Sequence, residues 1–317
     1  MPLVDMKDML HHAYTYGYAV GAFGVAGWDI LEGVVEAAEN ARAPVILSLS
    51  KSYPGTENIE SLALAVVGRA QRASVPVAFQ IELGGDPQEV EDAVKQGCSG
   101  VVFDASQHSL PENVALTKKA VSIASLNGVI VVGQLANLDS GDVAESAAVK
   151  STSAIEAKHY VERTGVMCLA VSVSRMERGS AKHDFTRLGK INQTLGIPLG
   201  IHGGGGLSDE QFRRMISYGA AKINYSIPLF EVMAQRIREN ALKPDAGYAS
   251  IMEQARAAIR EEVERCIRMW GCGGRAAEIL QNCRVWTSAT GVDSDTEARG
   301  TAVGEIPARH LYVKRSV

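Results

Sequence analysis

Short apolar runs rich in β-branched residues alternate with amphipathic stretches along most of the chain. The apolar runs occupy residues 19–25, 44–49, 76–81, 100–103, 129–132, 168–173, 198–201 and 221–224. Their nearly continuous hydrophobicity is what parallel strands buried on both faces require. The stretches between them have helical spacing, for example in residues 29–41, 61–72, 87–96 and 209–218. The pattern therefore predicts an α/β fold, a closed (β/α)8 barrel.

Two parts of the chain depart from this repeat. Residues 139–153 are small and polar with little periodicity, which favours a mobile loop after the fifth strand, a frequent position for an active-site lid. Beyond the last strand, residues 229–240 and 248–270 have helical spacing, and residues 285–317 are polar and rich in turn-forming residues. We predict that residues 1–284 form the barrel with its C-terminal helices, and that residues 285–317 form an appended tail packed on the barrel or on a partner subunit.

The composition agrees with one large domain. The chain has 317 residues, of which 46% are hydrophobic, and its 32 basic and 36 acidic residues leave a net charge of −4. No cluster of Lys or Arg is dense enough for a nucleic-acid footprint, so we expect no nucleic-acid partner. The N-terminal residues lack the apolar core of a signal peptide, and no apolar run approaches the ~20 residues that span a bilayer. We therefore expect a cytoplasmic protein without membrane contact.

The five cysteines are odd in number and scattered, and no CxxC pair occurs. This distribution argues against a disulfide framework and against a structural zinc site built from four cysteines. Cys98 and Cys168 lie in apolar surroundings, so we predict that both belong to the core.

Polar residues follow most of the predicted strands. In a (β/α)8 barrel the active site lies where the strands end, and the residues there are Ser50, Lys51, Gln80, Glu82, Asp104, Ser106, Gln134, Ser174, Arg175, His202, Asn224 and Ser226. The clearest local signal is the run after His202, which consists of Gly203, Gly204, Gly205 and Gly206. Glycines let backbone N–H groups converge on an anion, and the loop after the seventh strand is a usual phosphate site of this fold. The run predicts a bound phosphorylated small molecule, with a glycine-rich turn that binds nothing as the alternative.

Individual side chains at these ends allow more than one interpretation. Glu82 follows an apolar strand and is a candidate base or metal ligand rather than a surface Glu. Lys51 suits a Schiff base or a phosphate clamp, and the alternative is a solvated loop lysine. Lys222 lies inside the last strand, where an ion pair within the barrel would explain it. Arg175 suits a second anion contact or a surface role, and His202 is a candidate metal ligand, acid–base group or structural histidine.

Short sequence motifs, which occur in the same order from about residue 3 to residue 277, match a known family. They include Gly21-Ala22-Phe23, Asp104-Ala105-Ser106, the segment 198–206 and Lys222-Ile223-Asn224. The chain resembles the class II fructose-bisphosphate aldolases, most closely their tagatose-bisphosphate-like branch. The resemblance implies a (β/α)8 barrel and a carbon–carbon lyase that acts on a phosphorylated ketose or dihydroxyacetone phosphate. It also implies a zinc ion that polarises the ketose carbonyl, and we expect a homodimer or homotetramer.

The zinc ligands of that family are largely missing. At the end of the third strand the family has His-Leu-Asp-His-Gly, in which the Asp is the acid–base residue and the second His binds zinc, and this chain has Gln80-Ile81-Glu82-Leu83-Gly84. Glu82 can replace the Asp, whereas Leu83 cannot bind a metal. The next zinc His aligns with Glu177 or its neighbour, so only His202 remains of the three histidines. The cofactor is therefore unknown: Glu82, Glu177 and His202 would suit Mg²⁺ or Mn²⁺ better than zinc, and a site without metal is the other possibility.

The residues that correspond to the family's phosphate-binding motifs match better than the residues that correspond to its zinc ligands. Ser50, Asn224 and three of the four glycines in the run match the family, while Gly205 stands where the family has Ser. Ser226 replaces an Asp of the family, and Gly24 replaces an Asn near the substrate. We therefore predict that one phosphate site is retained and that the rest of the pocket is remodelled.

We favour an aldolase-type lyase that works through an enediolate or enamine without the usual zinc site. Its base would be Glu82, with Gln80 beside it, and its electrophile would be Lys51 or Lys222 as a Schiff base or Arg175 as an oxyanion partner. Two alternatives stay open: a non-catalytic phosphosugar-binding or partner subunit, and a sugar-phosphate isomerase or epimerase. The enzyme is favoured because the changed positions are polar and cluster at strand ends.

Overall fold

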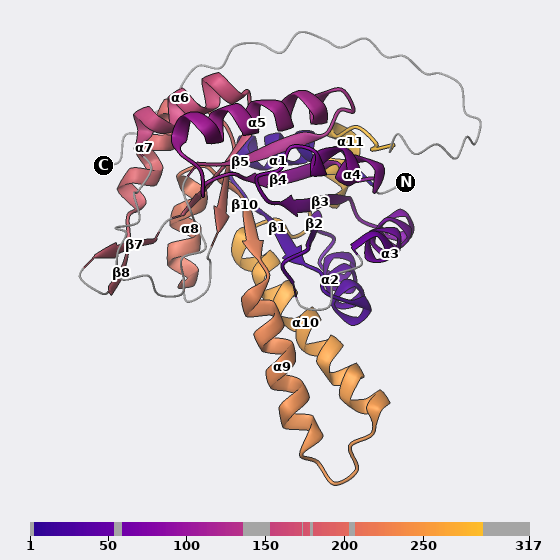
Figure 1. Ribbon diagram of the computed structural model, residues 1–317. Coiled ribbons are helices and arrows are strands. Elements are labelled where there is room, and N and C mark those ends of the chain that lie inside the picture. Colours follow the sequence, from indigo (N-terminus) through magenta and orange to yellow (C-terminus); the bar gives the residue numbers. More distant parts are fainter. Residues whose placement is uncertain are drawn as a thin grey trace.

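Eight parallel strands close into a barrel in the computed structural model (Figure 1). The structure describes residues 3–53, 59–135, 153–172, 174–177, 180–202 and 207–287, and of residues 174–177 and 180–183 it describes the backbone alone. The strand order around the barrel is β1-β10-β9-β6-β5-β4-β3-β2. The strands are β1 (Val20–Gly24), β2 (Val45–Ser50), β3 (Val77–Leu83), β4 (Gly100–Asp104), β5 (Ile130–Gln134), β6 (Cys168–Ser172), β9 (Leu199–His202) and β10 (Ala220–Tyr225). The predicted (β/α)8 barrel is confirmed.

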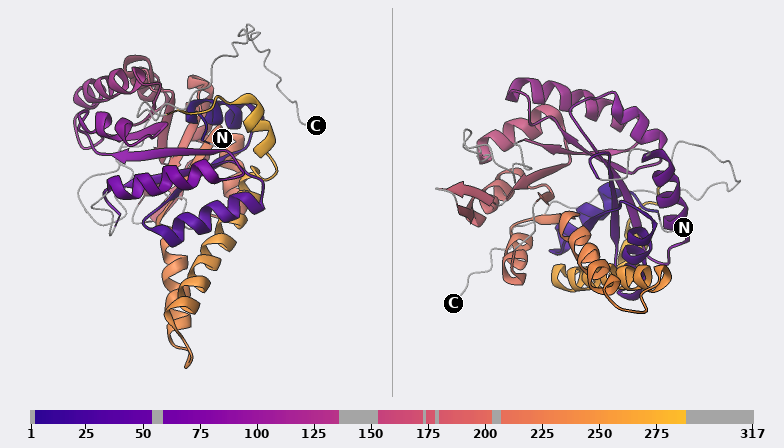
Figure 2. Two further views of the ribbon diagram at one scale, coloured as in Figure 1. Left: turned by 90° about the vertical axis from the view of Figure 1, so that its right-hand side faces the viewer. Right: turned by 60° about the horizontal axis from the view of Figure 1, so that its bottom comes forward.

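Helices alternate with the strands and cover the outside of the barrel (Figure 2). They are α2 (Trp28–Asn40), α3 (Ile59–Arg72), α4 (Glu89–Lys95), α5 (Leu110–Ser125), α6 (Ala154–Thr164), α7 (Phe185–Leu195) and α8 (Asp209–Ser217). At the start of α8, Ser208 Oγ accepts from the N–H of Gln211 at 3.3 Å, and the Gln211 side chain accepts from the N–H of Ser208 at 2.7 Å. This capping box satisfies two N–H groups that would otherwise lack partners, which fixes the helix start where the sequence predicted it.

An additional helix, α1 (Met6–Tyr16), packs against the amino ends of the strands. Its residues Met6, Met9 and Leu10 are buried, and the sulfur of Met6 occupies the space beside Gly100, the first residue of β4. The hydrophobic pattern did not single out this helix. Its apolar side chains close the end of the barrel that is opposite to the predicted active site.

The chain after α11 (Ala276–Asn282) returns to the N-terminal residues. Arg284 forms ion pairs with Asp5 at 2.6 Å and with Asp8 at 2.8 Å. The N–H of Trp286 donates to the carbonyl of Leu3 at 2.9 Å. The first residues of the predicted tail therefore pack on the barrel, and residues 288–317 lie outside the described residues.

Between β6 and α7 the structure has a hairpin that the sequence pattern did not predict. It consists of two antiparallel strands, β7 (Ser174–Glu177) and β8 (Ser180–His183). The predicted strand at residues 168–173 ends as β6 at Ser172. Of the predicted loop at residues 139–153, only Ser153 lies within the described residues, where it is the N-cap of α6.

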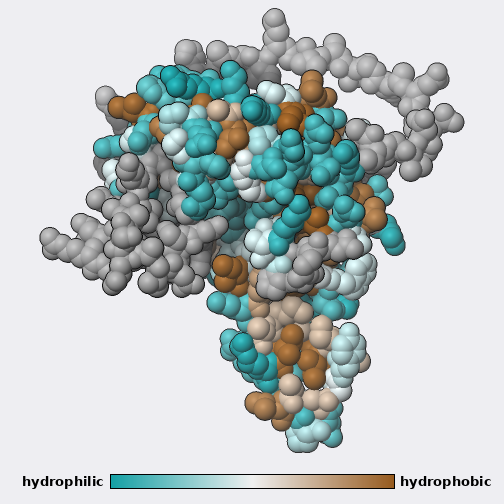
Figure 3. Space-filling model, in the orientation of Figure 1, coloured by the Kyte–Doolittle hydropathy of each residue, from teal (hydrophilic) through white to brown (hydrophobic). Residues whose placement is uncertain are grey.

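Two long helices, α9 (Ile227–Ala241) and α10 (Tyr248–Trp270), form an arm that projects from the barrel (Figure 1). Both confirm the predicted helical segments. At the end of α10, Trp270 stacks on Phe23 of β1 with the ring centroids 5.7 Å apart. Near the tip of the arm, Leu242 and Tyr248 are exposed, and apolar side chains are visible on its surface (Figure 3). The arm is thus anchored in the core and carries apolar surface at its far end.

In the part of the chain that the structure describes, no helix is both long and apolar enough to cross a membrane. All five cysteines are buried and free, as expected from their number and spacing. Cys98 and Cys168 belong to the hydrophobic core.

The contact between β1 and α10 leads to a stability prediction. A Cβ atom on Gly21 would lie 2.7 Å from Cζ3 of Trp270 and 2.4 Å from Cε2 of Phe23, whereas a Cβ on Gly84 would meet nothing within 4 Å. We expect Gly21→Ala to lower the free energy of unfolding by about 1–3 kcal/mol because it overpacks the core. The control Gly84→Ala should stay within about 0.5 kcal/mol of the parent protein. Urea unfolding measures both, and equal effects would contradict the packing argument.

Candidate active site at the barrel mouth

The register of the strands gathers polar side chains at one end of the barrel. Side chains alternate along a strand, and in a closed barrel every second one enters the interior. Neighbouring positions at the carboxyl ends pair across the strands as Ser48 with Gln80, Ser50 with Glu82, Asp104 with Gln134, and Ser172 with His202. The mouth of the barrel is therefore polar although the strands themselves are apolar.

Glu82 is held in place by hydroxyl donors. Ser48 Oγ donates to Glu82 Oε1 at 2.8 Å and accepts from Gln80 Nε2 at 2.8 Å. The hydroxyl of Tyr53 donates to the same Glu82 oxygen at 3.3 Å. These bonds fix a carboxylate on the inner face of β3, at the position where the sequence predicted an acid–base group.

Tyr53 joins two sides of the mouth. Its hydroxyl lies 2.8 Å from Oγ of Ser226, which follows β10. A phenol has one proton to donate, so Ser226 donates to Tyr53 when Tyr53 donates to Glu82. Burial and then the charge of Glu82 raise the pKa of Tyr53 above its ordinary value, which keeps it a neutral donor. The sequence analysis missed Tyr53, because it lies in the loop after β2 and not at a strand end.

Lys222 lies deeper in the barrel, on β10. Its side chain is fully buried, and its Nζ has no hydrogen-bond partner among the described residues. It sits beside Gly200 of β9, where a Cβ atom would lie 3.9 Å from Cδ of Lys222 and 3.7 Å from Sγ of Cys168. Burial lowers the pKa of Lys222 to about 8, and the charges of Cys168 and Glu82 oppose that shift only in part. The amine is thus desolvated at the base of the mouth.

His202 and Asn224 form the side of the mouth next to Lys222. Asn224 Nδ2 donates to His202 Nε2, and Asn224 Oδ1 has no partner within the described residues. Burial and the nearby charge of Lys222 lower the pKa of His202 to about 3. His202 is therefore a neutral imidazole whose Nε2 is already used as an acceptor.

The described side chains do not fit a catalytic zinc ion, which takes three protein ligands. No group of three His, Cys, Asp or Glu residues within the described ranges could hold a metal. The Nε2 of His202 accepts from Asn224, and Glu82 accepts from Ser48 and Tyr53. The side chain of Glu177 in β7 lies outside the described residues, so its suggested metal role stays a prediction.

Comparison with known proteins identifies the family. The model of class-II fructose-bisphosphate aldolases matches residues 4–275. The chain belongs to this family. A fructose-bisphosphate aldolase of Geobacillus stearothermophilus is 32% identical over 290 residues, covering 88% of this chain and 100% of that one. The solved structure of the YdjI aldolase from Escherichia coli K12 has a TM-score of 0.77 at 29% identity and covers 86% of this chain and 99% of its own. The predicted family, fold and enzyme class, a carbon–carbon lyase, are confirmed.

Of the other predicted site residues in this aldolase-family chain, the structure describes the side chains of Lys51 and Ser50. Lys51 forms an ion pair with Glu89 of α4 at 2.9 Å, and 56% of its side chain is exposed. It therefore points to the outside of the barrel. Ser50 Oγ lies 2.7 Å from Ser52 Oγ at the end of β2. Arg175 is in β7, where only the backbone is described, and the four glycines of the predicted phosphate loop lie outside the described residues.

Asp104 at the end of β4 and Gln134 at the end of β5 add further polar side chains to the mouth of the barrel. Gln134 Nε2 donates to Asp104 Oδ2 at 2.7 Å, and the N–H of Ser106 donates to Asp104 Oδ1 at 2.9 Å. The buried Asn113 side chain donates to the backbone carbonyl of Gln134 at 3.0 Å. The sequence analysis placed Asp104 and Gln134 at strand ends without giving them a role, and the structure shows that they hold each other in place.

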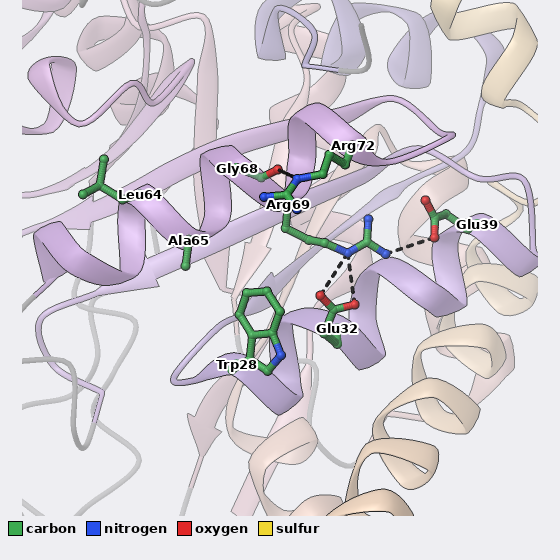
Figure 4. A pocket seen from close by; sticks show the side chains of 8 residues that line it. All are labelled: Trp28, Glu32, Glu39, Leu64, Ala65, Gly68, Arg69 and Arg72. Atoms are coloured by element: carbon green, nitrogen blue, oxygen red, sulfur yellow. Dashed lines mark hydrogen bonds and ion pairs between the residues drawn. The ribbon is translucent and has the colours of Figure 1, made fainter.

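A groove of about 460 Å³ lies elsewhere, on the outer wall between α2 and α3 (Figure 4). Its central cation, Arg69, pairs with Glu32 and Glu39, each at 3.0 Å. Trp28 and Leu64 also line it. Because its charges neutralise each other and it lies outside the barrel, this groove is not the aldolase active site.

The buried amine leads to a stability prediction with a pH dependence. An ammonium group without a partner is costly to bury, so we expect Lys222→Met, which fills a similar volume, to raise the free energy of unfolding at pH 7 by about 1–3 kcal/mol. The pKa of Lys222 falls from 10.5 to about 8 on folding, so the unfolded chain binds the extra proton between these values. The gain from Met is therefore fully present below pH 8 and is lost as the pH rises toward 10.5.

Urea unfolding at several pH values measures this effect. The control Lys51→Met removes an exposed ion pair and should change the free energy of unfolding by no more than about 1 kcal/mol. A Lys222→Met protein that is less stable than the parent at pH 7 would show that the ammonium has a strong partner.

Proposed function

We propose that this chain is an aldolase that cleaves and forms a carbon–carbon bond of a phosphorylated ketose, or condenses dihydroxyacetone phosphate, without zinc. The observation that carries the proposal is the Glu82 carboxylate held by Ser48 and Tyr53 at the barrel mouth. Family membership supports the reaction class. A small phosphorylated substrate, a cytoplasmic location and a homodimer or homotetramer are the corresponding expectations.

Glu82 moves the proton in this mechanism. In the cleavage direction its carboxylate takes the proton from the hydroxyl on the carbon that becomes the aldehyde, while the electrons of the breaking bond pass to the ketose fragment. Glu82 then returns that proton to the carbon of the resulting enediolate or enamine. Ser48 and Tyr53 orient the carboxylate, and Gln80 orients Ser48.

The remaining mouth residues position the substrate. Ser50, Asn224 and Ser226 face the mouth from β2 and from the end of β10 and offer hydroxyl and amide groups to the sugar hydroxyls and phosphate. The glycine run from Gly203 to Gly206 would supply backbone N–H groups to the phosphate. The absence of a third metal donor among the described side chains, together with the bond from Asn224 to His202, supports a reaction without zinc.

Glu82→Gln tests the proposed base. We expect kcat for cleavage of the active ketose phosphate to fall by about 100-fold or more, because an amide cannot accept the proton. A panel of ketose 1-phosphates and bisphosphates, with released triose phosphate measured, identifies the substrate. Glu112→Gln is the matched control, since Glu112 is 58% exposed next to His108.

The same assay tests the metal. Activity should persist after exhaustive chelation, and zinc should be substoichiometric in the purified protein. Loss of activity on chelation that returns with zinc would overturn the zinc-free mechanism. Exchange of a substrate proton without bond cleavage would favour an isomerase, and neither exchange nor cleavage across the panel would favour a binding protein.

Tyr53→Phe tests how Glu82 is positioned. The substitution removes one hydrogen bond to a charged group, which is worth about 1.5–3 kcal/mol, so we expect kcat to fall about 10- to 100-fold. Tyr14→Phe is the control, because the Tyr14 hydroxyl bonds Asn192 away from the mouth at 2.8 Å. Equal kcat values for the two variants would contradict the role of Tyr53.

A further inference from the structure

A second groove, the α3–α4 groove, lies on the outer wall of the barrel between these two helices and measures about 310 Å³. Leu64 of α3 lines it and is 77% exposed. The same leucine borders the groove of Figure 4, so it lies between two hollows of the surface. Ala63 and Val67 add further apolar lining. A hollow with an exposed leucine in it suits an apolar side chain from another segment.

The described part of the chain ends beside the α3–α4 groove. Nε1 of Trp286 donates to the carbonyl of Gly97 at 3.1 Å, and Gly97 lines the groove. The ion pairs of Arg284 with the N-terminal residues hold the preceding part of the chain in place. Thr287 is the last described residue. Residues 288–317 therefore start next to the groove, and they lie beyond the family match, which ends at residue 275.

The charges of the groove favour a basic occupant. Its charged side chains are Glu60, Asp92 and Lys95. Lys95 and Asp92 pair with each other at 3.0 Å. Within the described ranges Glu60 forms no ion pair, so one carboxylate at the groove is left without a cation. A segment that brings both apolar and basic side chains would complement this surface.

Residues 306–315 of the tail have this composition. They combine large apolar side chains with basic ones and contain no Asp or Glu. The apolar residues are Ile306, Leu311, Tyr312 and Val313, and the basic ones are Arg309, Lys314 and Arg315.

The chain between Thr287 and this segment is long enough to reach the groove. Residues 288–305 number 18, and an extended chain of that length spans at most about 60 Å. Helix α3 has 14 residues and is about 21 Å long. A tethered segment of the same chain also meets the groove at an effective concentration that can reach about the millimolar range, which a second copy in dilute solution does not match.

We propose that residues 306–315 bind the α3–α4 groove of their own chain. An apolar side chain between Leu311 and Val313 covers Leu64, and a neighbouring basic side chain pairs with Glu60. The tail is then a strap that ties α3 and α4 together across the outer wall of the barrel. This surface lies outside the barrel mouth, so the inference does not depend on the proposed aldol reaction.

Photo-cross-linking in the full-length protein tests the strap. Tyr312 is replaced by benzoylphenylalanine, the protein is irradiated, and the cross-linked peptides are located by mass spectrometry. We expect cross-links to residues 60–67 and 92–97. Leu64→Asp should lose them, because an apolar side chain cannot cover a carboxylate. Glu60→Lys should lower their yield, and added salt should reduce that difference because it screens the charges.

Leu126→Asp is the matched control. Leu126 is 86% exposed at the C-cap of α5 and does not line the groove, so this variant should keep the cross-links. Urea unfolding checks that each variant is folded, which is expected because both leucines are exposed.

A mixture of unlabelled and 15N-labelled protein shows which chain supplies the groove. Cross-links within one isotope support the proposal. Cross-links that join the two isotopes would place the tail on a second copy and overturn it. Cross-links to another surface, the absence of cross-links, or an undiminished yield in Leu64→Asp would overturn it as well.

Discussion

Closure of the parallel barrel is the constraint on which the site depends. Because eight strands share one interior, alternate side chains from every strand must enter the same small volume. A polar residue near the carboxyl end of any strand therefore faces polar residues from strands far away in sequence. This is how Tyr53, next to β2, comes to bond both Glu82 on β3 and Ser226 after β10. The alternation of side chains along each strand therefore determines both which residues form the hydrophobic core and which polar residues meet at the mouth.

The interior also explains the electrostatics of the mouth. A carboxylate buried there needs donors, and Glu82 receives them from Ser48 and Tyr53. A lysine buried there needs acceptors, and the described residues provide none for Nζ of Lys222. A chain that selection had optimised for stability alone would replace this amine with an apolar residue. Lys222 therefore stays in the barrel at a cost in stability, and the same burial lowers the pKa of its amine.

The hydrophobic pattern predicted the fold well because the barrel strands are short, nearly continuous apolar runs, whereas the helices that cover them are amphipathic. The α1 helix and the β7–β8 hairpin were not predicted, since α1 mixes polar and apolar residues and the hairpin follows β6 without an apolar run. For the site, the strand ends predicted Gln80, Glu82 and Asn224, which the structure brings to the mouth. Tyr53 could not be found this way because a loop, not a strand, positions it.

The two candidate lysines differ in whether their positions face the interior or the outside of the barrel. Ser48 enters the barrel, so Ser50 enters and Lys51 turns outward, where Glu89 meets it. Lys222 shares the inward parity of Asn224. The inward or outward direction of each side chain depends on the register of the strands, which the sequence pattern did not define. The phosphate role of the glycine run stays a prediction.

The most direct test of the account is a crystal structure of the active protein with a bound ketose phosphate. The account predicts the Glu82 carboxylate within hydrogen-bond distance of the substrate hydroxyl whose proton it takes, and no metal ion between the substrate and His202. A substrate carbonyl oxygen bound to a metal ion in the mouth would contradict it.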